Sequence, residues 1–325
     1  VTFLHYDGLH WSPMESGTTR WLFSVGGYGP WLDVIEHPGA VFVSGGEGTI
    51  LRYEGIEWVT MSSGVSTDLR AIWGIDGYNV LSAGSEGNLL QYNGASWNAI
   101  YTHTNDLLLG VWSTGVHKYS VGEGGTLVTC DGDSCNSDII AAGTLYNVWG
   151  ASGSDLYAVG ERGMIRHNDG SGWQTIDSGT SQDLKVIHGV GGQSVYVVGD
   201  EGTILRYDGP PWLEVGTVST VYSMWGTAKN SIYAVCPSGP IWHFNGSDWE
   251  QMSSAAGVSL WGVWGTSEQN IFAAGHAIPS EDGGVVLQYD GSSWETVLED
   301  DPGYALFSVW GTSADQVFVV GYSGA

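Results

Sequence analysis

The stretch that decides the fold reads Val195-Tyr196-Val197-Val198-Gly199-Asp200-Glu201-Gly202-Thr203-Ile204-Leu205-Arg206-Tyr207-Asp208-Gly209-Pro210-Pro211-Trp212. It contains two short runs of β-branched and aromatic residues, which are typical of strands, with a Gly-rich turn between them. The second run ends in Tyr-Asp-Gly. This sequence favours a tight turn, because Gly adopts positive φ and Asp bonds the turn backbone. The stretch therefore predicts two antiparallel strands, followed by a further strand that starts at the Trp.

The same phrase recurs along the whole chain, roughly every 40 residues. The Trp after the Tyr-Asp-Gly turn recurs, with Cys135 in its place once, at Trp11, Trp58, Trp97, Trp173, Trp212, Trp249 and Trp294. An inner aromatic residue recurs in the same way at Trp73, Trp112, Trp149, Trp225, Trp264 and Trp310. His188 replaces it in one repeat, and we expect Ile35 to replace it in another. Both series then have eight members.

Each repeat holds four short segments of strand character, separated by turns of Gly, Asn, Asp and Ser. In one repeat they are Leu69–Trp73, Asn79–Ala83, Asn88–Tyr92 and Ser96–Ile100. No segment shows a helical period, and four strands in about 40 residues are typical of a β-propeller blade. The sequence predicts an all-β chain with residues 1–325 in a single propeller of eight four-stranded blades. Seven blades are the alternative, if the Ile35 repeat is excluded.

The two ends of the chain complement each other. Residues 302–325 contain the first two strands of a repeat, and residues 1–14 contain the last two. We therefore expect the last blade to be closed by strands from both termini, which removes the open edges of the ring. Large flat Trp and Tyr side chains are expected to fill the wedge between neighbouring blades.

The phrases Val309-Trp310-Gly311-Thr312-Ser313 and Val317-Phe318-Val319-Val320-Gly321 carry a resemblance to known proteins. With the Gly-Thr-Ile-Leu-Arg-Tyr-Asp-Gly phrase that begins at Gly202, they resemble the propeller repeats of bacterial secreted and surface proteins. They are also loosely similar to kelch repeats, although the distance from Tyr to Trp is shorter here. The resemblance covers the whole chain and implies the fold rather than a chemistry, because its residues are core and turn residues.

Composition excludes several classes of partner. The chain has 35 Asp and Glu against 9 Lys and Arg, so its formal net charge is -26. Such a surface lacks the basic footprint that nucleic acids and anionic membranes require. No apolar run reaches the length of about 18 residues that a membrane span needs. Because Val1 is not a natural start, the sequence is compatible with a cleaved leader.

Cys130 and Cys135 occupy the Tyr and Trp places of one repeat, facing each other across a short turn. This placement predicts a disulfide and an oxidising compartment, hence a secreted or cell-surface protein. The alternative is a pair of small buried hydrophobic residues. Zinc is disfavoured because no second pair of ligands has suitable spacing. We expect the remaining cysteine, Cys236, to be buried.

Acidic residues recur in the turn between the second and third strands of the repeats, at Glu47, Glu86, Glu123, Glu161, Asp200 and Glu201. Asp68, Asp106 and Asp183 lie in the connections between repeats, which belong to the same face of a propeller. The face should carry a negative field. Calcium is the one cofactor that these carboxylates suggest, and solvated turn residues are the simpler interpretation. His188 is expected in the core, with a ligand role in the centre of the ring as the alternative.

Three departures from the repeat are candidate binding sites, because insertions on a rigid scaffold often carry function. We expect Glu15–Pro30, His276–Gly284 and Leu298–Ala305 to be insertions on the face that carries the acidic turns. Together they provide the aromatic and acidic residues Trp21, Phe23, Tyr28, Trp31, Tyr304, Glu281, Asp282, Glu299, Asp300 and Asp301. Such a combination suits a glycan or a basic protein surface. The alternative is that these loops only pack over the ring closure.

The sequence contains none of the common nucleophile, zinc-protease, phosphate-loop or dinucleotide motifs. The hypothesis is therefore a non-enzymatic, secreted or cell-surface propeller that binds protein or glycan through its acidic, loop-rich face. A carbohydrate-active enzyme that uses carboxylates on that face is the first alternative. A structural unit of a larger surface assembly is the second.

Overall fold

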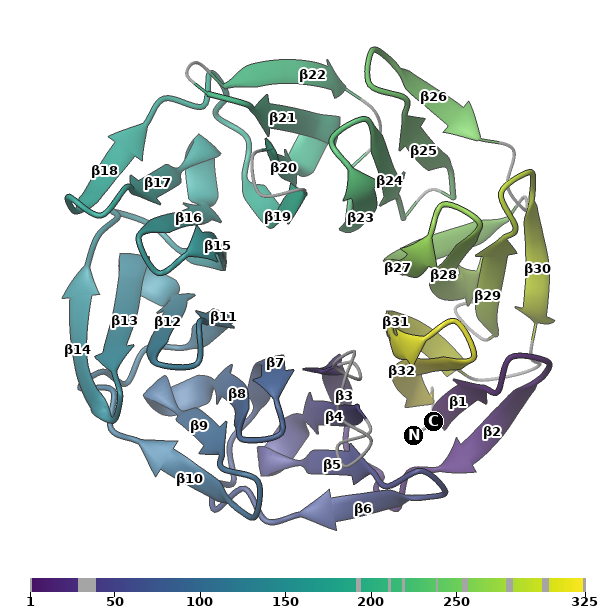
Figure 1. Cartoon of the computed structure of the whole chain (residues 1–325), viewed down its shortest axis with the longest axis horizontal. Helices are drawn as coiled ribbons and strands as arrows, with labels where there is room; N and C mark the ends of the chain where they lie inside the picture. Colours follow the sequence, from purple (N-terminus) through teal and green to yellow (C-terminus); the bar gives the residue numbers. More distant parts are fainter. Residues whose placement is uncertain are drawn as a thin grey trace.

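The computed structural model describes residues 2–28, 39–190, 194–209, 212–217, 220–237, 239–252, 257–278, 283–299 and 304–323. In these residues the regular structure is β strand, apart from short 3₁₀ turns. The strands form eight four-stranded antiparallel sheets, which are arranged as the blades of a ring (Figure 1). The predicted eight-bladed propeller is therefore confirmed, and the seven-bladed alternative is wrong.

Each blade runs from an inner strand near the axis to an outer strand at the rim. The inner strands of blades 1 to 8 are β3 (Leu22–Tyr28), β7 (Leu69–Asp76), β11 (Leu108–Ser113), β15 (Leu145–Ser152), β19 (Leu184–Val190), β23 (Ser223–Ala228), β27 (Val258–Ser267) and β31 (Tyr304–Ser313). The second strands are β4 (Ala40–Gly45), β8 (Asn79–Gly84), β12 (His117–Gly122), β16 (Asp155–Gly160), β20 (Ser194–Gly199), β24 (Ser231–Val235), β28 (Asn270–Ala277) and β32 (Gln316–Ser323).

The third strands are β5 (Ile50–Tyr53), β9 (Leu89–Tyr92), β13 (Thr126–Asp131), β17 (Ile165–Asn168), β21 (Thr203–Tyr207), β25 (Ile241–Phe244), β29 (Gly284–Tyr289) and β1 (Thr2–Tyr6). The outer strands are β6 (Trp58–Met61), β10 (Trp97–Ile100), β14 (Ser134–Ile139), β18 (Trp173–Ile176), β22 (Leu213–Thr217), β26 (Trp249–Met252), β30 (Trp294–Glu299) and β2 (Trp11–Glu15). No helix in these described residues is long and apolar enough to cross a membrane.

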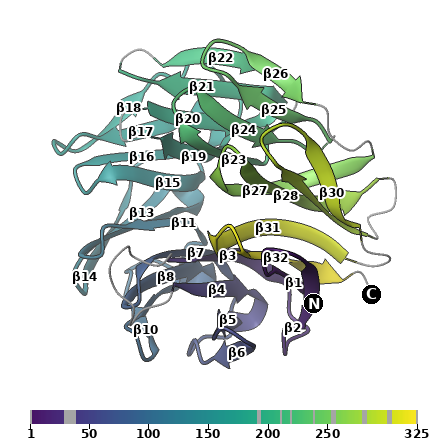
Figure 2. The ribbon, with the colours of Figure 1, turned by 45° about the vertical axis from the view of Figure 1, so that its right-hand side comes forward.

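Blade 8 joins the two ends of the chain, as predicted. Its strand order is β2-β1-β32-β31, and β1 pairs with β32 through Phe3↔Val320 and Tyr6↔Val317. Figures 1 and 2 show the N- and C-terminal ends next to each other at this blade. Because β1 and β32 pair through antiparallel backbone hydrogen bonds, neither strand is left as an open sheet edge within blade 8.

The antiparallel order gives the ring two distinct faces. The turn face carries the turns between second and third strands and the connections from one blade to the next. In blades 1 to 5 these turns contain the 3₁₀ elements η1 (Gly46–Gly48), η2 (Ser85–Gly87), η3 (Glu123–Gly125), η4 (Glu161–Gly163) and η5 (Asp200–Gly202). The hairpin face carries the other two turns of each blade, which join inner to second strands and third to outer strands.

Aromatic side chains fill the wedges between blades at two radii. At the outer radius, Trp58 of blade 1 stacks on Phe3 of blade 8 at a ring distance of 4.1 Å, and Trp58 is 7% exposed. At the inner radius, a Trp of one blade lies over a Gly of the next. A Cβ added to Gly150 of blade 4 would lie 2.8 Å from the Trp112 ring of blade 3. The recurring Trp-Gly step is therefore a packing device between neighbouring blades.

Blade 1 departs from this device. Gly26 pairs with Phe42, just as Trp310 pairs with Phe318 in blade 8, so Gly26 occupies the inner aromatic position. The expectation that Ile35 holds this position is wrong, and Ile35 itself lies outside the described residues. Without a ring between them, β3 and β7 approach directly. A Cβ on Gly74 of blade 2 would lie 2.8 Å from the Gly27 carbonyl oxygen.

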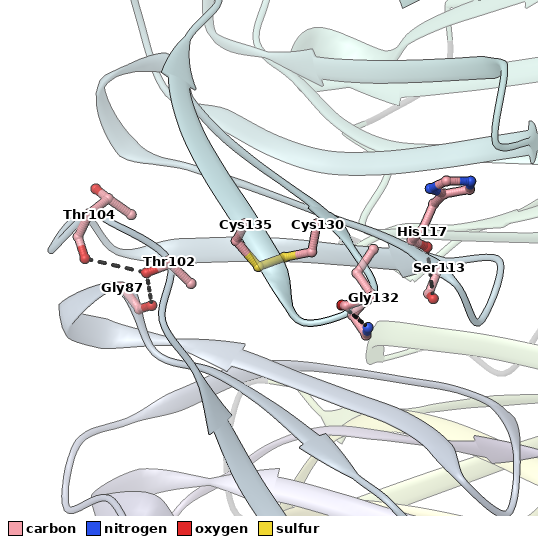
Figure 3. The surroundings of a disulfide bond; sticks show 9 residues. Gly87, Thr102, Thr104, Ser113, His117, Cys130, Gly132 and Cys135 are labelled. Carbon is pink, nitrogen blue, oxygen red and sulfur yellow. Dashed lines mark hydrogen bonds between the residues drawn. A yellow bond between two sulfur atoms is a disulfide. The ribbon is translucent and has the colours of Figure 1, made fainter.

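The predicted disulfide joins the third and outer strands of blade 3 (Figure 3). Cys130 and Cys135 are directly paired across the ladder, with Cα atoms 4.0 Å apart. Both are buried in one cluster with Leu81 of blade 2. At other blade interfaces a Trp faces a Phe or Tyr, as Trp97 faces Phe42. At this interface both partners are smaller. Cys236 is buried and forms no disulfide.

Candidate functional site

The first predicted insertion is misplaced. The connection from β2 to β3 spans residues 16–21, and it is no longer than the connection from β6 to β7, residues 62–68. The additional residues are 29–39, which link β3 to β4. Tyr28 and Ala40, which flank this segment, pair at the hairpin face. The error follows from Ile35. Because Ile35 was expected at the inner aromatic position, the inner strand was placed too late in the sequence, and the additional residues were assigned before it instead of after it.

The other two predicted insertions lie in blades 7 and 8. His276–Gly284 does lengthen the turn between β28 and β29, although Glu281 and Asp282 are outside the described residues. At the two ends of Leu298–Ala305 the chain is strand, because β30 continues to Glu299 and β31 begins at Tyr304, where the backbone pairs with Ser323. Asp300, Asp301 and Trp31 are also outside the described residues.

The remaining predicted ligand residues separate into two groups. Tyr28 is 9% exposed and belongs to a core cluster, where burial raises its pKa. Trp21 is 58% exposed at the turn face, and Phe23 lies near it on β3. Tyr28 therefore does not share a surface with Trp21 and Phe23. Trp21 and Phe23 lie at the turn face, and Tyr304 begins β31 at the same face.

The predicted calcium-binding residues are distributed over separate blades. Glu47, Glu86 and Glu201 occupy the second position of their turns, with φ of 53°, 58° and 54°. Glu123, Glu161 and Asp200 occupy the first position of theirs. Within the described residues, no group of three or more His, Cys, Asp or Glu side chains is placed to hold a metal ion. Six or more oxygen ligands, as calcium prefers, are not assembled by these turns.

Two aspartates in the blade connections hold these turns in place. Asp68 of blade 2 accepts a hydrogen bond from the Glu47 amide of blade 1 at 3.2 Å. Asp183 of blade 5 accepts one from the Arg162 amide of blade 4 at 2.9 Å and another from Lys185 at 2.9 Å. The Arg162 amide, followed by the Lys185 ammonium, lowers the pKa of Asp183. These carboxylates therefore join neighbouring blades.

A ring of side chains around the axis is the candidate site. In blade 2, Leu69 pairs with Gly84 and Ala71 with Ala83, so that Arg70 between them is a β-bulge. The same register shift occurs in all the remaining blades except blade 6. In blade 6, Tyr222 directly precedes the first pair of the inner strand. We call these eight residues the bulge ring: Phe23, Arg70, Leu109, Tyr146, Lys185, Tyr222, Trp261 and Phe307. Bulges re-aim side chains and are common beside functional sites.

Within the bulge ring, cations lie on aromatic rings at two places. The Arg70 guanidinium lies 4.1 Å from the centre of the Phe23 ring, and Arg70 also pairs with Asp68 at 2.7 Å. The Lys185 ammonium lies 3.9 Å from the centre of the Tyr146 ring. In each pair the cation belongs to the blade that follows the aromatic residue. Each pair is therefore a contact between adjacent blades.

The bulge ring changes character at blades 6 to 8. Tyr222 and Trp261 stack with ring centres 4.4 Å apart at an interplanar angle of 22°. Phe307 meets Trp261 edge to face at 5.5 Å. The Trp261 indole N–H donates to His276 Nδ1 at 3.2 Å. We call Tyr222, Trp261 and Phe307 the aromatic arc.

Carboxylates neutralise cations at the turn face. Arg20 pairs with Glu47, Arg70 with Asp68, and Lys185 with both Asp183 and Asp200. The turn acids Glu86, Glu123 and Glu201 are exposed. The face consequently has a negative field around the bulge ring.

Two other places are less suited to a ligand. His188 stands at the inner aromatic position, where burial lowers its pKa and a hydrogen bond with the Gly226 backbone opposes that effect. A cleft of about 600 Å³ lies between blades 8 and 1 at the hairpin face. Polar groups around it already bond within the protein, as His5 does with Gln316 at 3.1 Å and Arg52 with Tyr92 at 3.1 Å.

The bulge ring was missed by sequence reasoning, although a signal for it exists. The residue before each ring member is Leu in seven blades and Val221 in blade 6, and it is fully buried wherever it occurs. The next residue changes from blade to blade and is always large. A recurring buried Leu or Val followed by a variable large residue could have marked the position.

No family model matches the chain, and no curated protein resembles it in sequence. Solved structures with the same architecture do match. Sqt1 of Chaetomium thermophilum is 14% identical, with a TM-score of 0.74 and 98% of each chain covered. The C-terminal WD40 domain of Sif2 is 14% identical, with a TM-score of 0.69, covering 94% of this chain and 97% of that one.

A structure of YCF48 bound to a D1 peptide is 17% identical, with a TM-score of 0.58, covering 77% of this chain and 88% of that chain. At these identities the comparisons show the propeller fold, with WD40-type structures among its neighbours.

Proposed function

We propose that the chain is a non-catalytic binding module that holds a segment of a partner protein on its turn face, over the bulge ring. One observation carries the proposal. The same register position, which is partly or fully exposed in every blade, is occupied by a large side chain in all eight blades, while its identity varies around the ring. The buried residues around it repeat almost without change, so packing does not explain the variety.

The geometry of the position suits recognition. The bulge ring is built on the inner strands, whose backbones are held by ladder hydrogen bonds and by the Trp-Gly packing between blades. Side chains on rigid elements lose little freedom on binding, which favours affinity. Tyr, Trp and Arg, which are enriched at the energetic centres of protein interfaces, all occur in the ring.

A propeller in a solved complex supports the choice of ligand. YCF48, which shares the fold, is described in complex with a D1 peptide. The alternative of a carbohydrate-active enzyme requires two carboxylates facing each other across a sugar. In the turn face described here, Asp68 and Asp183 instead bind backbone amides and cations.

The proposal includes a secreted or cell-surface location, where the chain could form one unit of a larger surface assembly. The Cys130–Cys135 disulfide supports an oxidising compartment. Mass spectrometry of the protein isolated from its native source, without reducing agents, tests this part. A bridged Cys130–Cys135 peptide is expected, and reduced thiols at both positions would contradict the location.

Peptide selection tests the binding function. A random dodecamer phage library is panned against the chain, and the enriched peptides are synthesised and measured by fluorescence anisotropy. We expect Tyr222→Leu to weaken their binding by tenfold or more. Tyr78→Leu is the matched control, because Tyr78 is 57% exposed in a turn of the hairpin face.

Leu109 shows that the bulge ring accommodates Leu, so Tyr222→Leu should retain the fold, which circular dichroism and the thermal midpoint verify. If no peptide is enriched, or if the enriched peptides bind both variants as tightly as the original chain, the proposed function is wrong.

A further inference from the structure

We propose that the aromatic arc, Tyr222, Trp261 and Phe307, receives an Arg or Lys side chain from the bound protein segment. This inference rests on the proposed function and names the chemistry of the partner. A cationic group over aromatic faces would make a cation–π contact at the axis of the ring.

The chain itself shows that this register position holds cations on aromatic rings. Arg70 lies on Phe23 at 4.1 Å and Lys185 lies on Tyr146 at 3.9 Å, each within the distance of about 6 Å at which cation–π attraction is significant. Both contacts use the bulge residue of one blade and the bulge residue of the next. The ring's geometry therefore favours a cation over an aromatic face at two independent places.

Blades 6 to 8 repeat the aromatic half of this arrangement three times in succession. Their bulge residues are Tyr222, Trp261 and Phe307, so this part of the ring presents neighbouring aromatic systems where blades 2 and 5 present cations. Tyr222 is 37% exposed, and Trp261 and Phe307 are partly buried. A cation that completes the pattern in this part of the ring would come from the bound partner.

The arc is also oriented before a ligand arrives. The Trp261 indole donates to His276 Nδ1, which fixes the plane of its ring, and the stack on Tyr222 holds it from one side. A preorganised ring loses less conformational freedom when a ligand binds.

Charge selects the same partner. The formal net charge is -26, and Arg20, Arg70 and Lys185 at the turn face are paired with carboxylates. The field over the bulge ring therefore attracts cations and repels anions. A metal ion would need converging oxygen, nitrogen or sulfur ligands, which the described residues do not assemble. Aromatic carbon surfaces suit a weakly hydrated guanidinium better.

A direct test uses two small probes that differ in charge and not in shape. N-acetyl-arginine methylamide and N-acetyl-citrulline methylamide are titrated into the chain labelled with ¹⁵N at its Trp side chains. The Trp261 indole signal is assigned by its loss in Trp261→Leu. We expect the arginine probe to shift this signal and the citrulline probe to shift it by at most a fifth as much at equal concentration.

Trp21 provides the matched control within the same spectrum. It is exposed on the same face and lies outside the aromatic arc, so a specific site leaves its signal nearly unchanged. Tyr222→Leu is expected to weaken the arginine-induced shift of Trp261 about fivefold, while Tyr78→Leu leaves it unchanged. Equal shifts with citrulline, or equal shifts at Trp21 and Trp261, would overturn the inference.

The selected peptides separate this inference from the proposed function. In a peptide whose binding depends on Tyr222, each Arg is replaced by citrulline and each Lys by norleucine. We expect one such replacement to reduce affinity tenfold. If none does, the binding function stands and the cation inference is wrong. If no peptide depends on Tyr222, the proposed function fails, and the two-probe experiment still decides whether the arc binds a cation.

Discussion

Blade 2 and blade 7 are built on the same core but end differently at the turn face. In blade 2 the inner hairpin stops pairing at Leu69↔Gly84, and Ser85–Gly87 forms a tight 3₁₀ turn. In blade 7 the pairing continues beyond Leu260↔Gly275 to Val258↔Ala277. Blade 8 continues in the same way, from Leu306↔Gly321 to Tyr304↔Ser323.

This difference shows that the buried scaffold is kept the same in each blade, whereas the length of the hairpin at the turn face varies. Leu69, Leu260 and Leu306 are completely buried, whether the hairpin is short or extended. The residues directly before them differ, because Asp68 is partly exposed whereas Ser259 and Ala305 are buried, so this end of the hairpin varies from blade to blade. Aromatic bulge residues occur together in blades 6 to 8, in the part of the ring where the inner hairpins of blades 7 and 8 extend.

The largest expected effect tests whether the two blades share one scaffold. A Cβ on Gly84 would lie 2.0 Å from the Asp68 carbonyl oxygen, and a Cβ on Gly275 would lie 1.8 Å from that of Ser259. Because backbone must move to relieve either overlap, Gly84→Ala and Gly275→Ala should each lower the free energy of unfolding by about 3 kcal/mol. Urea denaturation measures both.

Gly17→Ala is the control, because nothing lies within 4 Å of a Cβ added there. Its φ of +68° is still unfavourable for Ala, which predicts a smaller loss of about 1 kcal/mol. If Gly275→Ala were tolerated while Gly84→Ala was not, the two blades would not share the same inner packing.

A smaller effect concerns the carboxylate that ties blade 4 to blade 5. Asp183→Asn weakens the charged hydrogen bonds to the Arg162 amide and Lys185, and we expect a loss of about 1 kcal/mol at pH 7. The pKa of Asp183 is lowered in the folded protein, so its contribution is complete above about pH 4. It is lost as the pH falls through the folded pKa.

The stability difference between the original chain and Asp183→Asn should therefore shrink between pH 7 and pH 3, as measured by urea denaturation at each pH. Blade 8 has Ala305 at the equivalent place, directly before its buried Leu, and among the eight blades only Asp68 and Asp183 supply a carboxylate there. Asp138→Asn, at an exposed position of β14, is the control. A difference that grows toward pH 3 would contradict the stated role of Asp183.

The smallest effect tests the strain in the 3₁₀ turns. Glu86 has a φ of 58°, which is unfavourable for residues with a side chain, and blade 3 has Gly124 at the same place. Glu86→Gly should raise the free energy of unfolding by up to about 1 kcal/mol. Glu123→Gly, one position earlier in its turn, should give no such gain. Thermal unfolding compares the two, and an equal gain would show that charge, rather than φ, sets the cost.

Much of the fold was predictable because it rests on residues that recur. The Trp positions, the Tyr-Asp-Gly turns and the complementary ends led to eight blades, closure in blade 8 and the Cys130–Cys135 bridge. Blade 1 was the exception, because Gly26 stands where a Trp was expected. A Gly has no side chain by which the repeat's inner aromatic position could be recognised in the sequence. Its role became visible through its pairing with Phe42.

The candidate site was less predictable. Long loops drew attention to Glu15–Pro30, yet the described structure shows Tyr28 in the core and the extra residues after β3. The bulge ring lies inside strands that look regular in sequence. A bulge is a shift in pairing between two strands, and a single strand's composition does not record it.

By itself the amino-acid sequence determined the repeat, the number of strands in each blade and the means of closing the ring. These follow from local turn chemistry and from aromatic residues that must be buried at every blade interface. The tertiary structure alone decided which side chains meet around the axis. Phe23 and Arg70, or Tyr222 and Trp261, come from different blades and are adjacent because the closed ring brings equivalent bulges together. Register and closure are properties of paired strands, so contacts between blades appear only when the whole ring is assembled.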